Sequence, residues 1–515
     1  ITERGFLRER GETFVTIPTE NTGYYTWLSN NHGTINTTKL NKVGLYATGT
    51  YVYNNRYVLN LSVRTDATNN FGTRSNFLPI WAVSGRWDIK EDILKKTKWV
   101  DALSLKASMG YQGNMLDSET PNLIIRHGSY SNLYDDYTST VENFPNPNLK
   151  FEKKLSTNYA LDFSLWNRLL NGNISFFYNK TKDAFLNKTV SLINGVNQYV
   201  VNRGNISNTG IELTLNFTPF NNVGASGSKR GFTWRFDPQF GQVVNKLIKY
   251  AINDRNKTFQ DELRYTQLLD GTLEIPEEPI GTFYSYKYKG LNPENGQPMF
   301  EGIDQEEFEK IYDATEDKKD VYFMVMEKSG TRIPIIQGGI NNYFAYRDFS
   351  LTLNFTYSLG NKIRLLKLCS GYASQTPKPQ ENMRKEFVDR WRRPGDEAYT
   401  DIPALSTAMY SNQAWYAYKP YAFTSSLYEM YDYSNLRVAS GNFLRLQTMQ
   451  FQYRLSEKAC KWMGISSAYI GIVGTNLYTW CAKELKGQNP EQSGTSDVIN
   501  LAIRPTYSLN LNISF

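Results

Sequence analysis

The residues best suited to ligand binding form a run of aromatic side chains within the stretch 415–433. Tyrosine and tryptophan present flat apolar faces with a polar edge, which suits stacking on sugar rings or holding a peptide. Such rings also pack well inside a protein, so an alternative is that they pack a long loop on itself. Two further polar stretches, 112–150 and 245–277, are weaker candidates for the same role. The candidate ligand-binding residues are Trp415, Tyr416, Tyr418, Tyr421, Tyr428, Tyr431 and Tyr433.

Residue patterns for catalysis are missing from the sequence. The two histidines, His32 and His127, belong to no HExxH sequence, and no Walker or dinucleotide-binding loop occurs. The three cysteines, Cys369, Cys460 and Cys481, show neither a CxxC pair nor metal-ligand spacing. The carboxylates are scattered, so nothing indicates the pair that a glycosidase needs. We therefore expect no catalytic residues, no metal site and no cofactor, and we expect that the protein is not an enzyme.

The composition excludes two further classes. The mean hydropathy of the 515 residues is −0.51. No run approaches about 18 apolar residues, which excludes a transmembrane helix. The net charge of +7 comes from 57 basic and 50 acidic residues without a long basic block, so nucleic-acid binding is not expected.

The last ten residues alternate strictly between apolar and polar side chains. Tyr507, Leu509 and Leu511 share one face with Ile513 and Phe515, and small uncharged residues occupy the other. A period of two is that of a β-strand. A strand of this length with one apolar and one polar face suits a wall between lipid and a watery lumen.

The same alternation recurs along the chain. The clearest segments are 57–64, 103–111, 158–165, 211–218, 351–358 and 449–455, and weaker ones are 13–28, 44–54, 78–88, 171–181, 188–201, 231–243, 281–290, 337–348 and 466–478. These segments predict about fourteen to sixteen strands, with boundaries uncertain by a few residues. The best helical candidate lies around 381–393.

The connections alternate between short and long. Short turns fall at 54–56, 167–171 and 347–348, whereas 112–150, 245–277 and 362–440 are long and polar. Short turns on one side and long loops on the other are typical of an outer-membrane barrel, and aromatic residues near strand ends suit its interfacial girdles. The sequence thus predicts an all-β protein whose fold is a transmembrane antiparallel β-barrel. A soluble propeller or tandem sandwich also alternates, but the sequence shows no 40–50-residue repeat of the kind that a propeller has.

Several motifs in order resemble the SusC/RagA-like TonB-dependent outer-membrane transporters. They are RYVLNLSVRTD at 56–66 with FG at 71–72, LSLKASMGYQGN at 103–114, NPNLKFEK at 146–153, FYNKTKD at 177–183, NISNTGIEL at 205–213, PIGTFYSY at 279–286 with GLNPENG at 290–296, GGINNYF at 338–344, GNK at 360–362, RWRRPGD at 390–396, FLRL at 443–446 and GTNLYTW at 474–480. From the motifs we expect close backbone approach, bulges or bends in a curved sheet at Gly72, Gly110, Gly210 and Gly338. We also expect the RWRRPGD run to anchor the long 362–440 loop, or else to be an ordinary loop with a packed tryptophan.

The resemblance implies a barrel of about 22 strands, of which residues 1–515 would be the C-terminal part, with the plug domain and the N-terminal strands outside this chain. It implies multi-pass insertion in the outer membrane of a Gram-negative bacterium. The expected function is TonB-energised import of glycans or peptides with a SusD-like lipoprotein lid, against which the aromatic run would also pack.

Further partners implied by the resemblance are TonB through the missing plug region, the rest of the transporter chain, a second SusCD pair in a dimer, and the lipid and lipopolysaccharide of the membrane. Two alternatives remain open from the residues alone. One is a secreted soluble β-rich protein that binds glycans, and the other is an outer-membrane adhesin or enzyme barrel.

Overall fold

The computed structural model describes most of the chain. The described residues are 2–8, 35–68, 77–114, 123–143, 145–146, 149–189, 198–221, 231–250, 263–272, 275, 277–302, 305–314, 325–369, 384–405, 413–416, 423–492 and 503–515. The predicted strand at 13–28 lies outside them, as does the centre of the one at 188–201.

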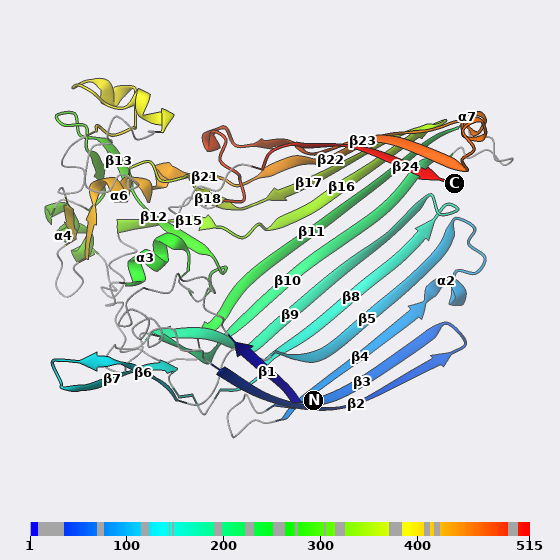
Figure 1. The fold of residues 1–515 in the computed structure, drawn as a ribbon, viewed down its shortest axis with the longest axis horizontal. Helices are drawn as coiled ribbons and strands as arrows, with labels where there is room; N and C mark the ends of the chain where they lie inside the picture. The colour runs from blue at the N-terminus through cyan, green and yellow to red at the C-terminus, as the bar shows by residue number, and fades with distance from the viewer. Residues whose placement is uncertain are drawn as a thin grey trace, which may run out of the picture. The chain divides into compact units, whose positions relative to one another are not determined.

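One sheet of fourteen strands dominates the described residues (Figure 1). In hydrogen-bonded order these are β1 (Thr2–Arg8), β2 (Ile35–Tyr53), β3 (Tyr57–Thr68), β4 (Phe77–Asp88), β5 (Val100–Asn114), β8 (Glu152–Leu165), β9 (Leu170–Thr189), β10 (Gln198–Asn221), β11 (Phe232–Tyr250), β16 (Ile336–Tyr346), β17 (Phe349–Leu359), β22 (Phe443–Arg454), β23 (Ser467–Cys481) and β24 (Thr506–Ser514). Wherever the register is known, neighbouring strands run antiparallel. The number falls within the fourteen to sixteen strands that the alternation predicts.

The chain divides into two compact units. The first comprises Ile1–Arg86, Ala107–Thr157 and Asn179–Asn205, and the second comprises Trp87–Lys106, Asn158–Tyr178 and Ile206–Phe515. In the first unit, β2 and β3 are joined by a tight turn in which Asn54 and Asn55 have φ of 51° and 55°. Positive φ at both central residues is the type I′ geometry that matches the twist of a hairpin, and asparagine tolerates it well.

The predicted loop 112–150 contains a hairpin of its own. Strands β6 (Ile124–Ser131) and β7 (Asp136–Asn143) form a separate two-stranded antiparallel sheet in the first unit. Figure 1 shows this hairpin apart from β2 and β3 of the same unit. The segment is therefore not structureless, although its strands do not join the large sheet.

In the second unit, the strand register sorts the side chains into apolar and polar rows. One row crosses six strands through Leu509, Ile472, Phe451, Leu351, Phe344 and Trp234. The adjacent row on the opposite face runs through Asn510, Gly471, Gln452, Ser350, Ala345 and Thr233. Leu509, Ile472 and Phe451 are 70%, 57% and 43% exposed. An apolar band of this width exposed to water would be unfavourable, whereas lipid would cover it at no cost.

Aromatic pairs lie at the short turns of the second unit. Trp99 and Trp166 have ring centroids 6.2 Å apart beside the turn before β9. Phe349 and Tyr453 are 4.8 Å apart beside the turn between β16 and β17. Rings of this kind, apolar with a polar tip in Trp and Tyr, favour the level of a membrane–water interface. Their position supports the predicted girdle.

Close approach explains three of the four glycines singled out in the sequence. A Cβ atom at Gly338 would lie 2.1 Å from the carbonyl oxygen of Gln239 and 2.4 Å from the hydroxyl oxygen of Tyr357. Comparable clashes would arise at Gly110 and Gly210. Gly72 lies outside the described residues. At these sites the absence of a side chain lets an aromatic ring or a neighbouring strand lie across the sheet.

The remaining elements are short. They are α2 (Ile89–Asp92), α3 (Leu263–Asp270), β12 (Thr282–Tyr286), β13 (Tyr288–Leu291), β14 (Pro298–Phe300), α4 (Gln305–Ala314), β15 (Met326–Thr331), β18 (Lys362–Arg364), η2 (Lys385–Asp389), η3 (Asp396–Ala398), β19 (Gln413–Tyr416), β20 (Phe423–Ser426), α6 (Leu427–Asp432), η4 (Asn435–Arg437), β21 (Val438–Ser440), α7 (Glu457–Trp462) and η5 (Lys483–Leu485). No helix among the described residues is long and apolar enough to cross a membrane.

Most of these elements pack into one mass in the second unit, which we call the loop body and define as the described parts of 263–302, 325–334, 361–369, 384–405, 427–442 and 483–492. Its core comprises Leu268, Leu269, Tyr284, Tyr286, Phe300, Val325, Met326, Leu368, Cys369, Phe387, Tyr428, Met430, Tyr431 and Tyr433. Figure 1 shows α3, β12, β15, β18 and β21 at one end of β16, β17 and β22.

The loop body corrects two predictions. The predicted strand at 281–290 forms β12 and β13, which pair in two small sheets instead of joining the large one. All five side chains of β12 are buried, so this segment has no lipid-facing side. Of the helix predicted around 381–393, the described part, 384–393, contains the short 3-10 helix η2, which ends just before Arg390 and Trp391.

Candidate functional site

A cavity of about 960 Å³ lies in the second unit. Its polar lining residues are Thr272, Arg332, Gln337, Thr356, Ser358, Asn361, Arg445, Gln447 and Glu491, and its apolar ones include Ile280, Ile333, Pro334, Ile363, Phe443 and Pro490. Strands β16, β17 and β22 supply one wall, and segments of the loop body supply the rest. The volume is at the upper end of the range of about 300–1,000 Å³ for ligand sites.

The sheet wall of the cavity is the polar face that the alternation predicted. Register pairs Gln337 with Ser358, and Ser358 in turn with Phe443. Thr356 is paired with Arg445 on the same face. Because side chains at alternate positions of a strand share a face, these residues converge on one space. The cavity therefore lies on the side of the wall opposite the apolar band.

Arg445 fastens the segment after β23 to this wall. Its guanidinium donates from Nε to Thr479 Oγ1 at 3.1 Å and from an Nη to Asn489 Oδ1 at 3.3 Å. The same Nη lies 2.9 Å from Glu491 Oε2, and the guanidinium covers the Phe443 ring at 4.8 Å. Asn489 and Glu491 are thus held at the edge of the cavity.

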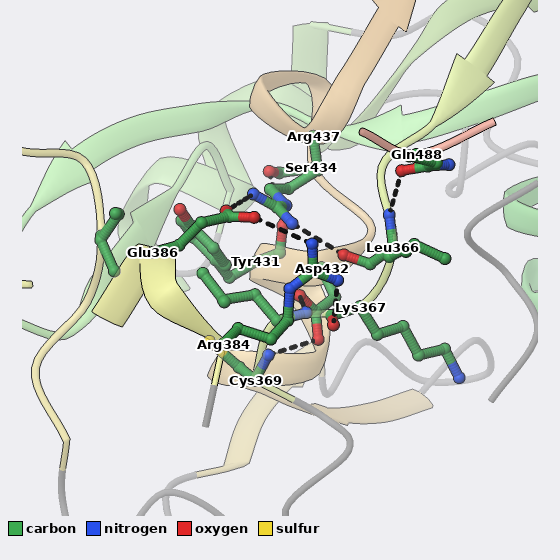
Figure 2. Close-up of polar contacts among 12 residues, drawn as sticks. Leu366, Lys367, Cys369, Arg384, Glu386, Tyr431, Asp432, Ser434, Arg437 and Gln488 are labelled. Atoms are coloured by element: carbon green, nitrogen blue, oxygen red, sulfur yellow. Dashed lines mark hydrogen bonds and ion pairs between the residues drawn. The ribbon is translucent and has the colours of Figure 1, made fainter. Parts of the chain in front are cut away.

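Buried charges hold the loop body together (Figure 2). Arg437 donates to Glu386 Oε2 at 2.9 Å and to the carbonyl oxygen of Leu366 at 2.7 Å. The two charged side chains are only 5% and 10% exposed. Arg384 contributes a second ion pair to the same carboxylate, to Oε1 at 2.9 Å. A charge buried in this way is tolerable only while it is paired and hydrogen-bonded.

A second set of contacts fixes the segment 366–369. The backbone N–H groups of Leu368 and Cys369 donate to the two carboxylate oxygens of Asp432 at 2.6 and 2.9 Å. Gln488 accepts from the N–H of Leu366 at 2.8 Å and donates to the carbonyl of Arg364 at 3.0 Å. Figure 2 shows Asp432 and Gln488 reaching this segment. Because neighbouring Asn361, Ile363 and 490–491 line the cavity, the network also fixes two of its walls.

Arg364 is the most deeply buried cation of the loop body. Its guanidinium donates to the carbonyls of Tyr284 at 2.8 Å and Leu269 at 3.2 Å, and it lies 5.0 Å from the centre of the Tyr433 ring. Burial lowers the pKa of Arg364 to about 10, so the side chain stays charged at neutral pH. It joins α3, β12 and the end of α6, which are distant in sequence.

We expect acid to weaken the loop body. Burial alone would raise the pKa of the Glu386 carboxyl. The positive charges of Arg437 and Arg384 outweigh this effect, and the pKa of Glu386 lies below its ordinary value of 4.5. A carboxyl with a lowered pKa stabilises the fold above its unfolded pKa and loses that contribution as the pH falls through the folded value. Burial raises the pKa of Asp270, so that group acts in the opposite direction. The protection factors of the amides at 361–369 against hydrogen exchange should therefore fall below about pH 4, and Glu386→Gln should remove that dependence. An unchanged pH profile in Glu386→Gln would contradict the assignment.

The structure places the predicted aromatic ligand residues in two groups. Tyr428, Tyr431 and Tyr433 are 0%, 1% and 8% exposed in the core of the loop body. Rings so buried cannot stack on a ligand in this arrangement, and they fit the alternative that the loop packs on itself. Trp415 and Tyr416 lie in β19, whose backbone pairs with β20. Tyr418 and Tyr421 lie outside the described residues, and a ligand role for Trp415 and its neighbours stays a prediction.

The RWRRPGD run packs against another of the quoted motifs. A side chain at Gly296 would lie 2.3 Å from the ring of Trp391, and the carbonyl of Gly296 accepts from the N–H of Ala404 at 3.0 Å. Trp391 donates from Nε1 to Glu397 Oε2 at 3.0 Å. The run therefore does anchor part of the long loop, with the tryptophan as the packed residue.

Comparison with known proteins identifies the family. The family model described as TonB dependent receptor-like, beta-barrel matches residues 6–296, more than half of the chain. The chain belongs to this family. The fold class predicted from the sequence is confirmed, as is the resemblance to TonB-dependent transporters. Proteins of the family are outer-membrane β-barrels.

Relatives of the TonB-dependent receptor family match almost the whole chain. TonB-dependent receptor P3 of Formosa agariphila is 25% identical over 93% of this chain and 46% of its own length. TonB-dependent receptor SusC of Bacteroides thetaiotaomicron is 23% identical over 60% of this chain and 30% of its own. A solved structure of the RagAB peptide transporter matches 94% of this chain and 49% of that chain, with 19% identity and a TM-score of 0.71. The chain thus spans about half the length of the relatives that it matches. These relatives are receptors and transporters, in agreement with the expectation of a protein that is not an enzyme.

Sequence reasoning missed the cavity and the buried charges. Arg364, Asp432 and Arg437 lie in a polar stretch without periodicity, and their partners are up to 124 positions away, as for Gln488. The one local signal was the spacing of Tyr428 and Tyr431 at i and i+3, which indicates a packed helical face. Among the described residues, no group of His, Cys, Asp and Glu could hold a metal ion.

Proposed function

We propose that this chain forms the C-terminal barrel wall and outer loops of a TonB-energised outer-membrane importer. The cargo is a short glycan or peptide, and a SusD-like surface lipoprotein covers the loops. The observation that carries the proposal is the cavity, which lies on the polar face of strands whose other face is an exposed apolar band. Such a wall separates lipid from a lumen, and a cavity on the lumen side suits passing cargo.

Several parts of the proposal draw on the relatives. The names SusC and RagAB peptide transporter suggest import with a partner protein. The plug, and the contact with TonB, would belong to the part of the transporter that corresponds to the half of these relatives that this chain does not match. The loop body is a rigid platform in the proposal, because buried ion pairs and backbone hydrogen bonds hold its segments.

The test is purification of the tagged chain from outer membranes in mild detergent, followed by mass spectrometry and by growth assays on defined peptides and oligosaccharides. The proposal expects a plug-bearing polypeptide and a surface lipoprotein to co-purify. It also expects uptake of one cargo class to be lost when either this gene or the TonB gene is deleted. A chain recovered alone and soluble without detergent would support the secreted glycan-binding alternative. Unchanged uptake in both deletions would contradict import.

A further inference from the structure

We infer that the cavity binds a short oligomer through a carboxylate group, and that Arg332 is the residue that anchors it. This inference rests on the proposed function and adds the charge class of the cargo. It depends on three observations: the balance of charges around the cavity, the free donors of Arg332, and the nature of the neutral lining.

Among the described residues that line the cavity, one cation forms no ion pair. Its charged lining residues are Arg332, Arg445 and Glu491. Arg445 and Glu491 form an ion pair at 2.9 Å, and Arg445 also donates from Nε to Thr479 and from an Nη to Asn489. The charges of Arg445 and Glu491 cancel each other, and the pair fixes the segment after β23 on the sheet wall of the cavity. The lining therefore carries the single positive charge of Arg332.

Arg332 is fixed in place, and no described carboxylate forms an ion pair with it. Its backbone N–H donates to the carbonyl of Gly281 at 3.1 Å, and one Nη donates to the carbonyl of Gly271 at 3.3 Å. Within the described part of the chain, no carboxylate lies within the 4.0 Å of an ion pair with this guanidinium. Burial raises the pKa of the nearby Asp270, whereas the charges of Arg364 and, to a smaller extent, Arg332 favour its ionised form. A guanidinium has five N–H donors in a planar fork, so Arg332 retains donors for a planar carboxylate.

The rest of the lining suits an amide- or hydroxyl-bearing chain. Gln337, Gln447 and Ser358 offer both donors and acceptors, while Ile280, Ile333 and Pro334 offer aliphatic surface. The side-chain oxygen of Asn361 is buried without a hydrogen-bond partner.

Ring stacking contributes little to this cavity. The ring of Phe443 is only 8% exposed and is already covered by the guanidinium of Arg445. The hydroxyl of Tyr357 is bound to the carbonyl of Gln239. Recognition of a neutral sugar by stacking needs an open aromatic face. Anchoring by charge with hydrogen bonds along the chain is therefore the mode that the lining supports.

The experiment measures binding to the detergent-purified transporter with its co-purifying partners. Two probe pairs separate the two sources of a carboxylate. One is an acetylated hexapeptide of Gly, Ser and Ala with a free C-terminal carboxylate, compared with its C-terminal amide. The other is trigalacturonate compared with its methyl ester. In one pair, the charged probe should bind about 10- to 100-fold more tightly than its neutral analogue, the range for a charge-assisted hydrogen bond.

Variants of Arg332 test the anchor. Arg332→Gln should abolish the preference for the charged probe, and Arg332→Lys should restore part of it, with an affinity that falls as salt rises. A purely structural role would weaken both probes of a pair equally. Arg393→Gln is the control, because Arg393 is 85% exposed, pairs with Asp396 and belongs to the same unit without lining the cavity. That variant should leave both affinities unchanged.

Three outcomes overturn the inference. Equal binding of charged and neutral probes does so, and so does an undiminished preference in an Arg332→Gln protein that migrates as the folded form. If neither member of either pair binds, the inference is also overturned. If uptake still depends on TonB in that case, the proposed function is supported and only the role of Arg332 is wrong. If the protein prefers charged probes but uptake does not depend on TonB, the carboxylate site is supported and the proposed import function is wrong.

Discussion

Replacing Arg437 with methionine is expected to destabilise the loop body by about 3–5 kcal/mol. The substitution leaves the carboxylate of Glu386 buried without its main partner and frees the carbonyl of Leu366. Of its two ion pairs, Glu386 then keeps only the one with Arg384, whose side chain is 24% exposed. Removing the more deeply buried partner of a buried charge costs more than the pair contributes, which is why the expected effect is large. Hydrogen exchange of residues 361–369 and 427–440 measures the loss in the assembled protein, and limited proteolysis reports it independently.

Two controls define this result. Arg437→Met combined with Glu386→Leu removes the two most deeply buried charges and should recover most of the lost stability, since a neutral pair needs no partner. Arg384 loses its carboxylate in this variant, but its side chain is 24% exposed and keeps its bond to the carbonyl of Lys367. Arg126→Met breaks the exposed pair with Glu142 and should change stability by about 0–1 kcal/mol. Equal effects of the Arg437 and Arg126 substitutions would contradict the buried network.

The second large effect is expected on the apolar band of β24. Leu509→Arg should cost about 2–4 kcal/mol, because the charge would face the hydrocarbon near the middle of the strand. Leu509 is 70% exposed, so a surface residue of a soluble protein in the same position would tolerate arginine. The measurement is the folded fraction in lipid vesicles across a urea series, read by heat-modifiable migration.

The matched control lies one residue away. Ser508 occupies the opposite face of the same strand, paired with Val473. Ser508→Arg should change stability by less than about 1 kcal/mol, because a lumen-facing charge remains hydrated. A cost for Ser508→Arg equal to that for Leu509→Arg would contradict the assignment of the two faces.

The long strands could be predicted because their signal is local. Each wall strand separates two environments, so its own alternation records both faces, as Leu351 to Tyr357 in β17 and Tyr507 to Ile513 in β24 show. The short turns are equally local, since Asn54 and Asn55 favour positive φ by themselves.

The loop body could not be predicted, because its order comes from contacts between distant segments. Arg437 and Glu386 are 51 positions apart, and Gln488 is 124 positions from Arg364. Side chains of β12 are buried on both faces, which removes the alternation that marks a wall strand. Tyr428 and Tyr431 are tyrosines, which are equally suited to stacking on a ligand and to packing in a core. Only the structure shows that these two are buried in the core.

The most direct test of the account is the environment of successive residues along β24. Spin labels are attached to single cysteines at 508, 509, 510 and 511 in protein reconstituted into vesicles, after Cys481→Ser removes the exposed native thiol. The account predicts that labels at 509 and 511 collide mainly with lipid-soluble oxygen, and that labels at 508 and 510 collide mainly with a water-soluble nickel complex. If all four labels meet the nickel complex equally, the strand has no lipid face, and the barrel-wall account is wrong.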